Sequence, residues 1–384
     1  MAHDPGTIAA LREAVSTYVR DRLVPLEEWV ADNDRLPPEV VAEMREIGLF
    51  GLTVPEEYGG LGLALSQEID LVIALTWTSL AFRSILAMNL GVGSQGLVMD
   101  GTPEQRAAWL PRIANGEVVT AFALTEPGSG SDSAALRTTA RRDGDDYVLN
   151  GTKRFISNAP HAGLITVIAR TAPEKLPRNA HLTAFLVPAD SPGLSIGTPD
   201  RKMGQQGAAT ADVILDNVRL PASAILGGIE GRGFATAMKV LDRGRIHVAA
   251  VCVGQARRLL HEMLTYAQAR EAFGQPIAEF QLVQAMIADS MAEIAAAQAL
   301  VRETAARYDA GERVPREASC AKMLASEMVG RVADRAVQVH GGSGYIRGVA
   351  VERMYRDVRV LRIYEGTTQI QQLVIAKDLL RHGL

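Results

Sequence analysis

The spacing of apolar residues changes twice along this chain of 384 residues, and these changes restrict its possible folds more than any other feature. Before about residue 117, apolar side chains recur at intervals of three and four, as at Ile8, Leu11 and Val15, which is typical of amphipathic helices. From about Val118, short apolar runs separated by Gly, Pro and Asp predict strands. The helical interval returns at Gly233 and continues toward the end of the chain. The pattern predicts a mainly α-helical protein with a small β domain in its middle.

Three domains follow from this order: an N-terminal helical domain over residues 1–117, a middle β domain over 118–228 and a C-terminal helical bundle over 229–384. The bundle is predicted from four long helical segments with short joints. These segments are 234–269, 278–309, 315–340 and 366–381. The most linker-like stretch is Pro173–Pro177, which we expect to be an exposed loop of the β domain.

Within the β domain, five short runs predict strands. They are 118–124, 164–168, 182–187, 194–196 and 212–215. The strongest turn signal is Asn150-Gly151, between Asp146–Leu149 and Thr152–Ile156. Because Asn-Gly is favoured in two-residue type I′ turns, we predict a β-hairpin there.

Composition argues against several classes of protein. A formal net charge of -4 offers no electrostatic basis for binding nucleic acid or an anionic membrane. No stretch has the roughly 18 uncharged apolar residues of a membrane span, and the N-terminus lacks a signal peptide's features. Cys252 and Cys320 lie in helical apolar patterns, so we expect buried free thiols. No histidines or cysteines have metal-ligand spacing, and we predict no metal site and a cytoplasmic protein.

A carboxylate near the end of the chain, Glu365, is the strongest single candidate for catalysis. Gly366 follows it, and Thr367 and Thr368 are good N-caps for a helix. Apolar residues at helical spacing predict that this helix has one buried face; they are Ile370, Leu373 and Val374. An acid at the positive end of a helix can act as a base, with the glycine leaving room for a substrate, or it can merely complement the helix dipole.

A second candidate is the run from Ala121 to Asp132, where a predicted strand leads into a loop of small residues. Its hydroxyls and backbone N–H groups suit the oxygens of a flavin ring or a pyrophosphate, although such a run can also be a surface turn. A nicotinamide-binding fingerprint is absent, since the nearest approach, Gly342-Ser343-Gly344, has Arg347 in place of the third glycine.

Five runs, in this order along the chain, resemble those of the acyl-CoA dehydrogenase family. They are LTVPEEYGGLG (52–62), FALTEPGSGSD (122–132), REAFGQPIAEFQ (270–281), QVHGGSGY (338–345) and YEGTTQ (364–369). The resemblance implies a fold with a β-barrel-like middle domain and a C-terminal four-helix bundle. It also implies an FAD-dependent enzyme of acyl-CoA metabolism that desaturates an acyl-CoA at its α and β carbons. Electrons would pass to an electron-transferring flavoprotein, and the enzyme would be a homotetramer or a dimer.

In this resemblance, Glu365 matches the catalytic base. It would remove the α-proton of the thioester while the β-hydrogen leaves as a hydride to flavin N5. Because that proton is weakly acidic, the thioester oxygen must be hydrogen-bonded, and in relatives the donors are the backbone N–H of the base and a ribityl hydroxyl. Some branched-chain and long-chain relatives carry the base at the position of Gly244, so Glu365 is the base expected here.

The resemblance also assigns residues to FAD. Those expected to contact the flavin or its pyrophosphate are Phe122, Leu124, Thr125, Ser131, Phe155, Ser157, Thr367 and Gln369. Those expected to reach the FAD of a neighbouring subunit are Arg270, Phe273, Gln281, Gln338, Gly341 and Gly342.

Substrate residues come from the same resemblance. Asp242 and Arg245 match a segment that contacts the CoA pantetheine; Ser131 and Gly366 are further substrate positions. Arg83 resembles the arginine that glutaryl-CoA dehydrogenases place against a distal carboxylate.

Two further positions bear on the acyl tail. Ala208-Ala209-Thr210 is also nearer the glutaryl-CoA dehydrogenase pattern. However, Thr76 replaces the acid that accompanies the arginine in those relatives, which puts decarboxylation in doubt. The alternative for Arg83 is a cation that faces solvent or an interface.

Two other functions remain open on this scaffold. One is an enzyme that reduces oxygen, like an acyl-CoA oxidase or a nitroalkane oxidase, and the other is a catalytically silent assembly subunit. The residues also leave open the length, branching and polarity of the acyl group, and whether CoA or a carrier protein delivers it.

Overall fold

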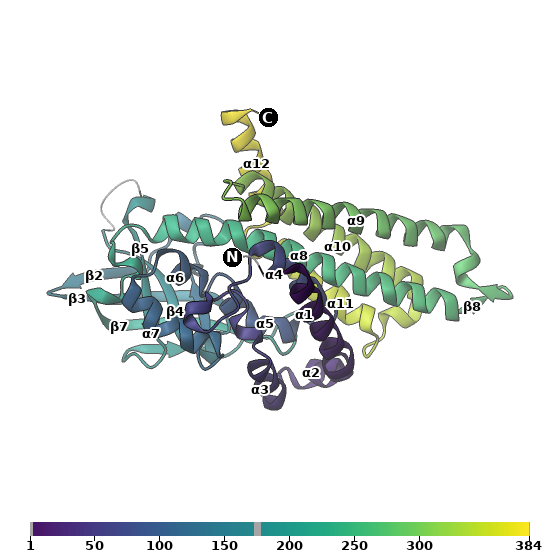
Figure 1. The fold of residues 1–384 in the computed structure, drawn as a ribbon, viewed down its shortest axis with the longest axis horizontal. Helices are drawn as coiled ribbons and strands as arrows, with labels where there is room; N and C mark the ends of the chain where they lie inside the picture. Colours follow the sequence, from purple (N-terminus) through teal and green to yellow (C-terminus); the bar gives the residue numbers. More distant parts are fainter. Residues whose placement is uncertain (1–2, 173–177, 384) are drawn as a thin grey trace.

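The computed structural model describes residues 3–172 and 178–383. The predicted linker-like stretch Pro173–Pro177 lies outside these residues. A sheet occupies one end of the molecule, and long helices extend from it to the opposite end (Figure 1). The fold is therefore mainly α-helical with a β domain in the middle of the sequence, as the apolar spacing predicts.

The N-terminal region is helical. Its helices are α1 (Pro5–Tyr18), α2 (Glu27–Asn33), α3 (Pro38–Glu46), α4 (Leu65–Leu75), α5 (Leu80–Leu90), α6 (Gln95–Asp100) and α7 (Pro103–Ala114). Proline begins α3 and α7, where its missing N–H costs nothing. These helices bury a shared core around Val19, Phe50 and Phe82. Leu71 and Leu75 of α4 belong to the same core.

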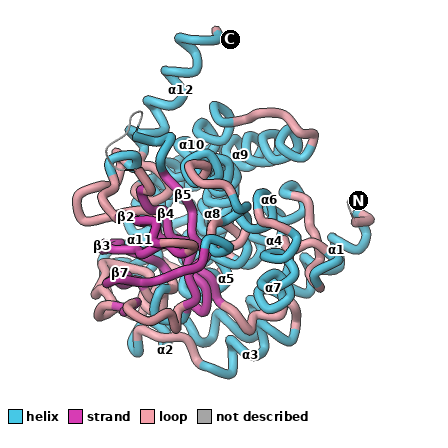
Figure 2. Tube along the Cα trace, turned by 90° about the vertical axis from the view of Figure 1, so that its left-hand side faces the viewer, coloured by secondary structure: helices cyan, strands magenta, loops and turns pink. Residues whose placement is uncertain are grey.

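The middle region is a curled, mixed sheet of seven strands. They are β1 (Val119–Ala123), β2 (Thr139–Asp143), β3 (Asp146–Ser157), β4 (Ala162–Arg170), β5 (Leu182–Pro188), β6 (Leu194–Ile196) and β7 (Thr210–Pro221). The order is β1-β4-β2-β3-β7-β6, with β5 paired to β4. Only β1 and β2 run parallel to β4; the other pairs are antiparallel. The strands lie beside one another at one side of the molecule (Figure 2). Each of the five predicted strand runs lies in one of these strands or overlaps it.

The predicted hairpin at Asn150-Gly151 is wrong, because β3 runs straight through this pair. The pairing of β3 with β7 shifts register there. The Asn150 side chain donates to Oδ1 of Asn217 on β7 and accepts a hydrogen bond from the backbone N–H of Asn217. Glycine is needed at 151 for close packing, since a Cβ would lie 2.4 Å from Oγ1 of Thr138. The turn into β3 instead lies at Gly144, which has a φ of 66°.

The C-terminal region contains α8 (Gly233–Ala269), α9 (Gln281–Asp309), α10 (Pro315–His340), α11 (Ala350–Val358) and α12 (Thr368–His382). A small hairpin of β8 (Glu271–Ala272) and β9 (Gln275–Pro276) joins α8 to α9. Helices α8, α9 and α10 lie side by side, and their apolar faces form one core with residues of α4 and α11 (Figure 1). The apolar pattern did not predict α11.

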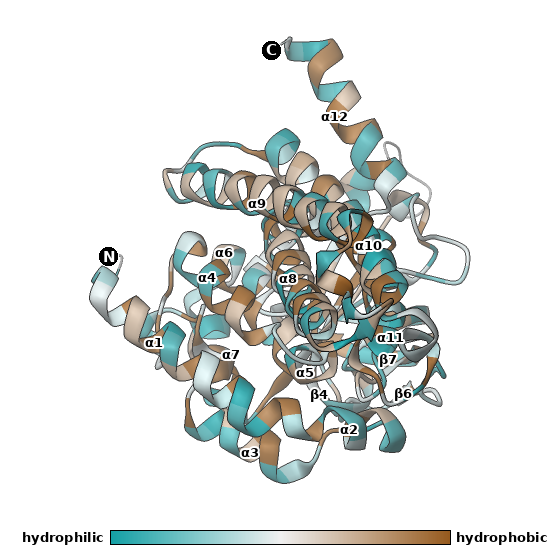
Figure 3. Cartoon of the chain, turned by 90° about the vertical axis from the view of Figure 1, so that its right-hand side faces the viewer, coloured by the Kyte–Doolittle hydropathy of each residue, from teal (hydrophilic) through white to brown (hydrophobic). Residues whose placement is uncertain are grey.

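Helix α12 leaves the bundle and projects away from it (Figure 3). Its predicted apolar face is therefore not buried within this chain, and Leu373 and Leu380 are 64% and 88% exposed. The prediction of a packed face was wrong at Leu373, because the helix has no neighbour there within the described residues.

Candidate active site

Glu365 lies in a short loop between a 3₁₀ turn (Arg359–Arg362) and α12. Thr367 is the N-cap of α12, and its hydroxyl accepts a hydrogen bond of 3.3 Å from the backbone N–H of Ile370. Glu365 itself has a φ of 53° and Gly366 a φ of 92°. A left-handed conformation is unusual for a glutamate and stores about 1–3 kcal/mol of strain, a feature that clusters at functional sites.

The Glu365 side chain extends over α8 at Gly244. A Cβ placed on Gly244 would lie 2.2 Å from Glu365 Oε2, so a larger residue there would displace the carboxylate. Oε2 is buried and has no hydrogen-bond partner among the described residues. The backbone N–H of Glu365 also donates to no acceptor within residues 3–172 and 178–383. An unpaired acceptor and an unpaired donor therefore belong to the same residue.

Three cations surround this carboxylate without binding it directly. Burial raises the pKa of Glu365 above its ordinary value, while the charges of Arg83 on α5, Arg245 on α8 and Lys322 on α10 act in the opposite direction. A carboxylate that is desolvated but still ionisable is a stronger base than one in water. The arrangement is suited to taking up a proton.

The loop is held by residues that the sequence analysis missed. Lys322 donates from Nζ to the carbonyl of Gly366 at 2.8 Å, and Gln371 donates from Nε2 to the carbonyls of Glu365 and Gly366 at 3.1 and 2.9 Å. One signal was available: Lys322 falls on the buried stripe of α10, between Ala318 and Ala325. A lysine in such a stripe is rare without a specific role.

The predicted substrate residues Asp242 and Arg245 lie on α8, the helix over which the Glu365 side chain extends. Asp242 and Arg245 form an ion pair of 2.6 Å, and Arg245 is buried, with its Nε unpaired among the described residues. Burial raises the pKa of Asp242, against the effect of Arg245. The charge of Arg245 acts on the Glu365 carboxylate and lowers its pKa, and Asp242 is linked to this group through its ion pair with Arg245.

Arg83 is buried on α5, only 8% exposed, so the solvent-facing alternative is wrong for the isolated chain. Its Nε lacks a hydrogen-bond partner, and the described residues offer it no carboxylate within ion-pair distance. Thr76, which replaces the acid of the glutaryl-CoA dehydrogenases, has no carboxylate, and its hydroxyl donates to the carbonyl of Val72 in its own helix. The charge of Arg83 lowers the pKa of His247, whose Nε2 is also buried and unpaired. Arg83 and His247 thus leave unsatisfied polar atoms near Glu365.

The loop after β1 contains several of the predicted flavin residues. Phe122 lies in β1, Leu124 and Thr125 follow it, and Ser131 is exposed farther along the loop. Phe155, from β3, has a φ of 59° and is 61% exposed, and Ser157 ends the same strand. Gly128 and Gly130 face open space.

A buried pair that the sequence analysis did not single out supports this loop. Glu126 and Lys153 form an ion pair of 2.8 Å, and Glu126 also accepts hydrogen bonds from the backbone N–H groups of Arg137 and Thr138. The Glu126 pKa is held low by these partners even though burial acts to raise it. The loop is anchored at its start and exposed at its glycines.

The residues predicted to contact a neighbour's FAD lie elsewhere, at the far end of the bundle near β8 (Figure 1). They are Arg270, Phe273, Gln281, Gln338, Gly341 and Gly342, and all are exposed. Phe273 is 96% exposed with a φ of 53°, and Tyr266 stacks on His340 to bring the two segments together.

These residues are far from the β-domain group along α8. Leu241 packs in the same core as Phe122, and α8 then runs on to Ala269, a rise of roughly 40 Å at 1.5 Å per residue. Within one chain, the predicted flavin residues of the β domain and the residues predicted to contact a neighbour's FAD are therefore far apart. Near Glu365, the Thr367 hydroxyl is engaged in capping and Gln369 is exposed.

Metal sites and membrane-spanning helices are both absent from the part of the chain that the structure describes. Its residues contain no group of three or more His, Cys, Asp or Glu side chains placed to hold a metal ion. Among its helices, none is both long and apolar enough to cross a membrane. Cys252 is a buried free thiol and Cys320 a partly buried one.

Comparison with known proteins agrees with this fold. Models of the acyl-CoA dehydrogenase N-terminal, middle and C-terminal domains match residues 7–117, 121–218 and 231–380. The 3-(aryl)acrylate reductase of Clostridium sporogenes is 41% identical over 372 residues, which cover 97% of this chain and 98% of that protein.

Solved structures are similar over the whole chain. A chain from structural work on the electron-transferring flavoprotein of Acidaminococcus fermentans has a TM-score of 0.95 at 35% identity, covering 99% of both chains. The glutaryl-CoA dehydrogenase of Mycobacterium smegmatis in complex with FADH2 has a TM-score of 0.91 at 31% identity, covering 100% of this chain and 96% of that one. This chain therefore belongs to the acyl-CoA dehydrogenase family of oxidoreductases.

Proposed function

We propose that the protein is an FAD-dependent acyl-CoA dehydrogenase in which Glu365 removes the α-proton of the acyl thioester. One observation carries the proposal: a buried carboxylate oxygen over Gly244, without a partner among the described residues, in a residue whose pKa burial raises. A structural carboxylate would be hydrogen-bonded. The carboxylate of Glu365 is instead available to a substrate.

The loop also supplies a candidate for enolate stabilisation. The backbone N–H of Glu365 has no acceptor among the described residues, and a positioned N–H is the kind of donor that stabilises developing oxyanion charge. If the thioester oxygen accepts this hydrogen bond, its α-carbon lies next to the Glu365 carboxylate. Proton removal and charge stabilisation would then depend on a single rigid residue.

The residues after β1 fit a flavin. The group offers an exposed aromatic ring at Phe155, hydroxyls at Thr125, Ser131 and Ser157, and glycines with open space around them, a donor set suited to a large planar ring with polar edges. Phe122 and Leu124 would supply apolar contact to the same ring. FAD, when bound, would accept the hydride from the β-carbon.

We also propose a homo-oligomer, either a dimer or a tetramer. Arg270, Phe273, Gln281, Gln338, Gly341 and Gly342 are exposed and distant from the β-domain group of the same chain, so they can contact FAD only in another copy. The projecting, apolar α12 offers further surface for such contacts. Thr367 and Gln369, at its start, remain proposed flavin contacts.

The substrate is proposed to be an acyl-CoA whose pantetheine passes Asp242, Arg245 and Ser131, with Gly366 leaving room at the thioester. Among the described residues no anion pairs with the buried Arg83 guanidinium, and an unpaired buried charge is destabilised by the loss of its hydration. This favours a polar or anionic acyl tail that reaches Arg83. The unpaired Nε2 of His247 would accept a hydrogen bond in the same place.

An electron-transferring flavoprotein is the proposed electron acceptor, in keeping with the related chain from Acidaminococcus. The likeness to an arylacrylate reductase favours a second possibility, the reverse reaction, in which Glu365 would return a proton to the α-carbon. The forward and reverse reactions use the same residue, so the site alone is compatible with either.

The test is an anaerobic screen of flavin bleaching across straight, branched, aromatic and dicarboxylic acyl-CoAs. The wild-type holoenzyme should bleach with at least one, and Glu365→Gln should keep its FAD but bleach about 10²- to 10⁴-fold more slowly. Near-normal bleaching by the variant would refute Glu365 as the base. Stoichiometric peroxide in air would favour an oxidase, and a protein that binds no FAD would favour a silent subunit.

A further inference from the structure

The loop that carries Glu365 depends on two buried side chains with no assigned role. Lys322 and Gln371, here called the carbonyl clamp, have no exposed surface. Between them they donate three hydrogen bonds to the carbonyls of Glu365 and Gly366. Glu365 and Gly366 both have positive φ, which is unfavourable for the glutamate. The clamp therefore holds the segment that contains this strained residue.

The environment of Lys322 is unusual for a buried lysine. No carboxylate lies within ion-pair distance among the described residues, and the bonded acceptor is the neutral carbonyl of Gly366. Lys153, the other fully buried lysine in the described part of the chain, instead pairs with Glu126 at 2.8 Å. A buried charge without a counterion opposes folding, so its presence at this carbonyl points to a role in the reaction.

The charge of Lys322 also acts on the carboxylate. Burial lowers the pKa of Lys322 to about 8, so it remains a cation at neutral pH, and its charge lowers the pKa of Glu365 against burial. The other groups that face Lys322 are Cys252 and Arg245 on α8 and Glu327 on α10. Cys252 is neutral at pH 7 because burial raises its pKa to about 12.

We propose that Lys322 and Gln371 are positioning residues of the reaction. They fix the Glu365–Gly366 carbonyls so that the carboxylate stays over Gly244 and the Glu365 N–H stays free for the thioester oxygen. Lys322 adds a positive charge that keeps the base ionised. The inference rests on the proposed role of Glu365.

The test compares Lys322→Met, which keeps length and apolar volume but removes the donor and the charge, with Ser326→Ala. Ser326 is a matched control: it is buried on the same helix, and among the described residues its hydroxyl bonds only to the carbonyl of Met323. We expect Lys322→Met to bleach about 10- to 100-fold more slowly at pH 7 with the best acyl-CoA of the screen. Ser326→Ala should keep the wild-type rate.

The pH dependence separates positioning from simple loss of stability. Without the cation, the pKa of Glu365 rises, so the acidic limb of the bleaching rate should move to higher pH by about one unit and part of the rate should return in alkali. Infrared titration of substrate-free protein should show a protonated buried carboxyl persisting to higher pH in Lys322→Met. Glu365→Gln should lack that signal.

The outcomes distinguish this inference from the proposed function. If Glu365→Gln is inactive but Lys322→Met has the wild-type rate and pH profile, the clamp is refuted and the base stands. If Lys322→Met is recovered only as aggregate, Gln371→Met is measured instead, and a slower rate with full FAD content supports the clamp. A wild-type rate in Gln371→Met overturns it.

Discussion

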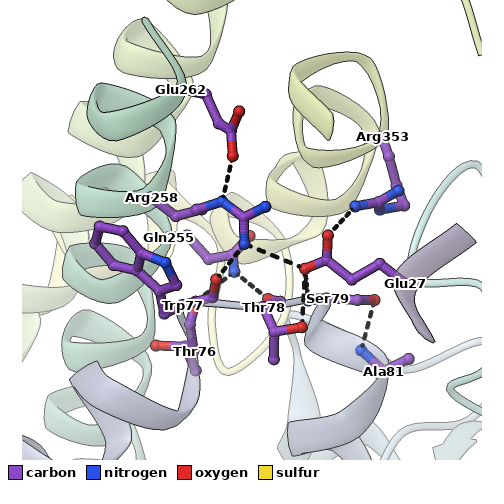
Figure 4. Close-up of polar contacts among 10 residues, drawn as sticks. All are labelled: Glu27, Thr76, Trp77, Thr78, Ser79, Ala81, Gln255, Arg258, Glu262 and Arg353. Carbon is purple, nitrogen blue, oxygen red and sulfur yellow. Dashed lines mark hydrogen bonds and ion pairs between the residues drawn. The ribbon is translucent and has the colours of Figure 1, made fainter. Parts of the chain in front are cut away.

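Two regions of the helical core contain buried carboxylates, and the hydrogen bonding of these carboxylates differs between the regions. In the first region, Glu27 of α2 is fully engaged (Figure 4). It accepts hydrogen bonds from the Thr78 hydroxyl, from the backbone N–H of Ser79 and from Arg258 and Arg353, at 2.8, 2.9, 3.4 and 2.5 Å. Glu27 thereby fixes α2 and the start of α5, the helix that carries Arg83, against α8 and α11.

Glu68 of α4 is a second structural acid with fully engaged partners. It is fully buried, pairs with Arg243 and accepts a hydrogen bond of 2.6 Å from Nδ1 of His247. Burial alone would raise its pKa, but Arg243 and His247 outweigh burial and the pKa lies below its ordinary value. This carboxylate stays charged and holds α4 to α8.

Glu365 differs from Glu68 in what contacts its oxygens. Within the described part of the chain it has three cations nearby but none in contact, and one of its oxygens has no hydrogen-bond partner; burial raises its pKa. The comparison shows that burial does not by itself make a carboxylate reactive. Unsatisfied hydrogen-bonding capacity distinguishes the candidate base from the structural acids.

The largest expected effect is a difference in the free energy of unfolding between variants of the two kinds of carboxylate. Glu68→Gln should lower the free energy of unfolding by about 3–5 kcal/mol at pH 7, because Arg243 loses its buried counterion. Glu365→Gln should leave it unchanged or raise it by about 1 kcal/mol. A raised folded-state pKa means that the ionised acid destabilises the native state above its unfolded pKa, and a neutral amide removes that cost. Urea unfolding of the two matched variants measures both.

Equal losses of stability in the two glutamine variants would break the comparison. Glu365 would then be a structural acid, and its missing partner would carry no functional meaning.

A smaller effect is expected at Gly244. Gly244→Ala places a methyl group where Glu365 Oε2 lies, and the flexible end of the glutamate must move aside. The protein should still fold, because only a side-chain tip is displaced, whereas the bleaching rate should fall about 100-fold. Stopped-flow bleaching and thermal melting of the same sample separate the two quantities. A wild-type rate would show that the carboxylate works from another position.

The smallest effect concerns Arg83. Arg83→Met should reduce the preference for dicarboxylic over straight-chain acyl-CoAs about 10-fold, since one charge-assisted contact to the distal carboxylate is lost. Removing this cation also raises the pKa of Glu365, so the acidic limb of the rate should move to higher pH. Ratios of kcat/KM across pH measure both changes. Unchanged selectivity would leave Arg83 only an electrostatic neighbour of the base.

Much of the fold followed from the sequence because apolar spacing reports directly on helices and strands. The long helices α8 to α10 have strong periodicity, and β4 is a short continuous apolar run bounded by turn residues. The hairpin prediction at Asn150-Gly151 was wrong because the glycine is required by close packing against Thr138 rather than by a turn. Helix α11 was missed, although its residues Val351, Met354 and Val358 are buried at helical spacing.

The candidate site was less accessible from the sequence. Glu365 could be singled out because its local sequence places it before a helix N-cap. Lys322 could have been noticed as a lysine in an apolar stripe, but its hydrogen bond to the Gly366 carbonyl could not be predicted. Gln371 and Glu126 could not be singled out, because their roles depend on contacts that form only in the folded chain. The buried, unpaired states of Arg83 and His247 likewise arise only after packing.

The most direct test of the central claim isolates proton removal from the rest of the reaction. Acetyl-CoA has α-hydrogens but no β-carbon, so its α-hydrogens can exchange with heavy water without any hydride leaving. Wild-type holoenzyme should catalyse this exchange under anaerobic conditions, and Glu365→Gln with full FAD content should not. Equal exchange catalysed by the two proteins would contradict the assignment of Glu365 as the base.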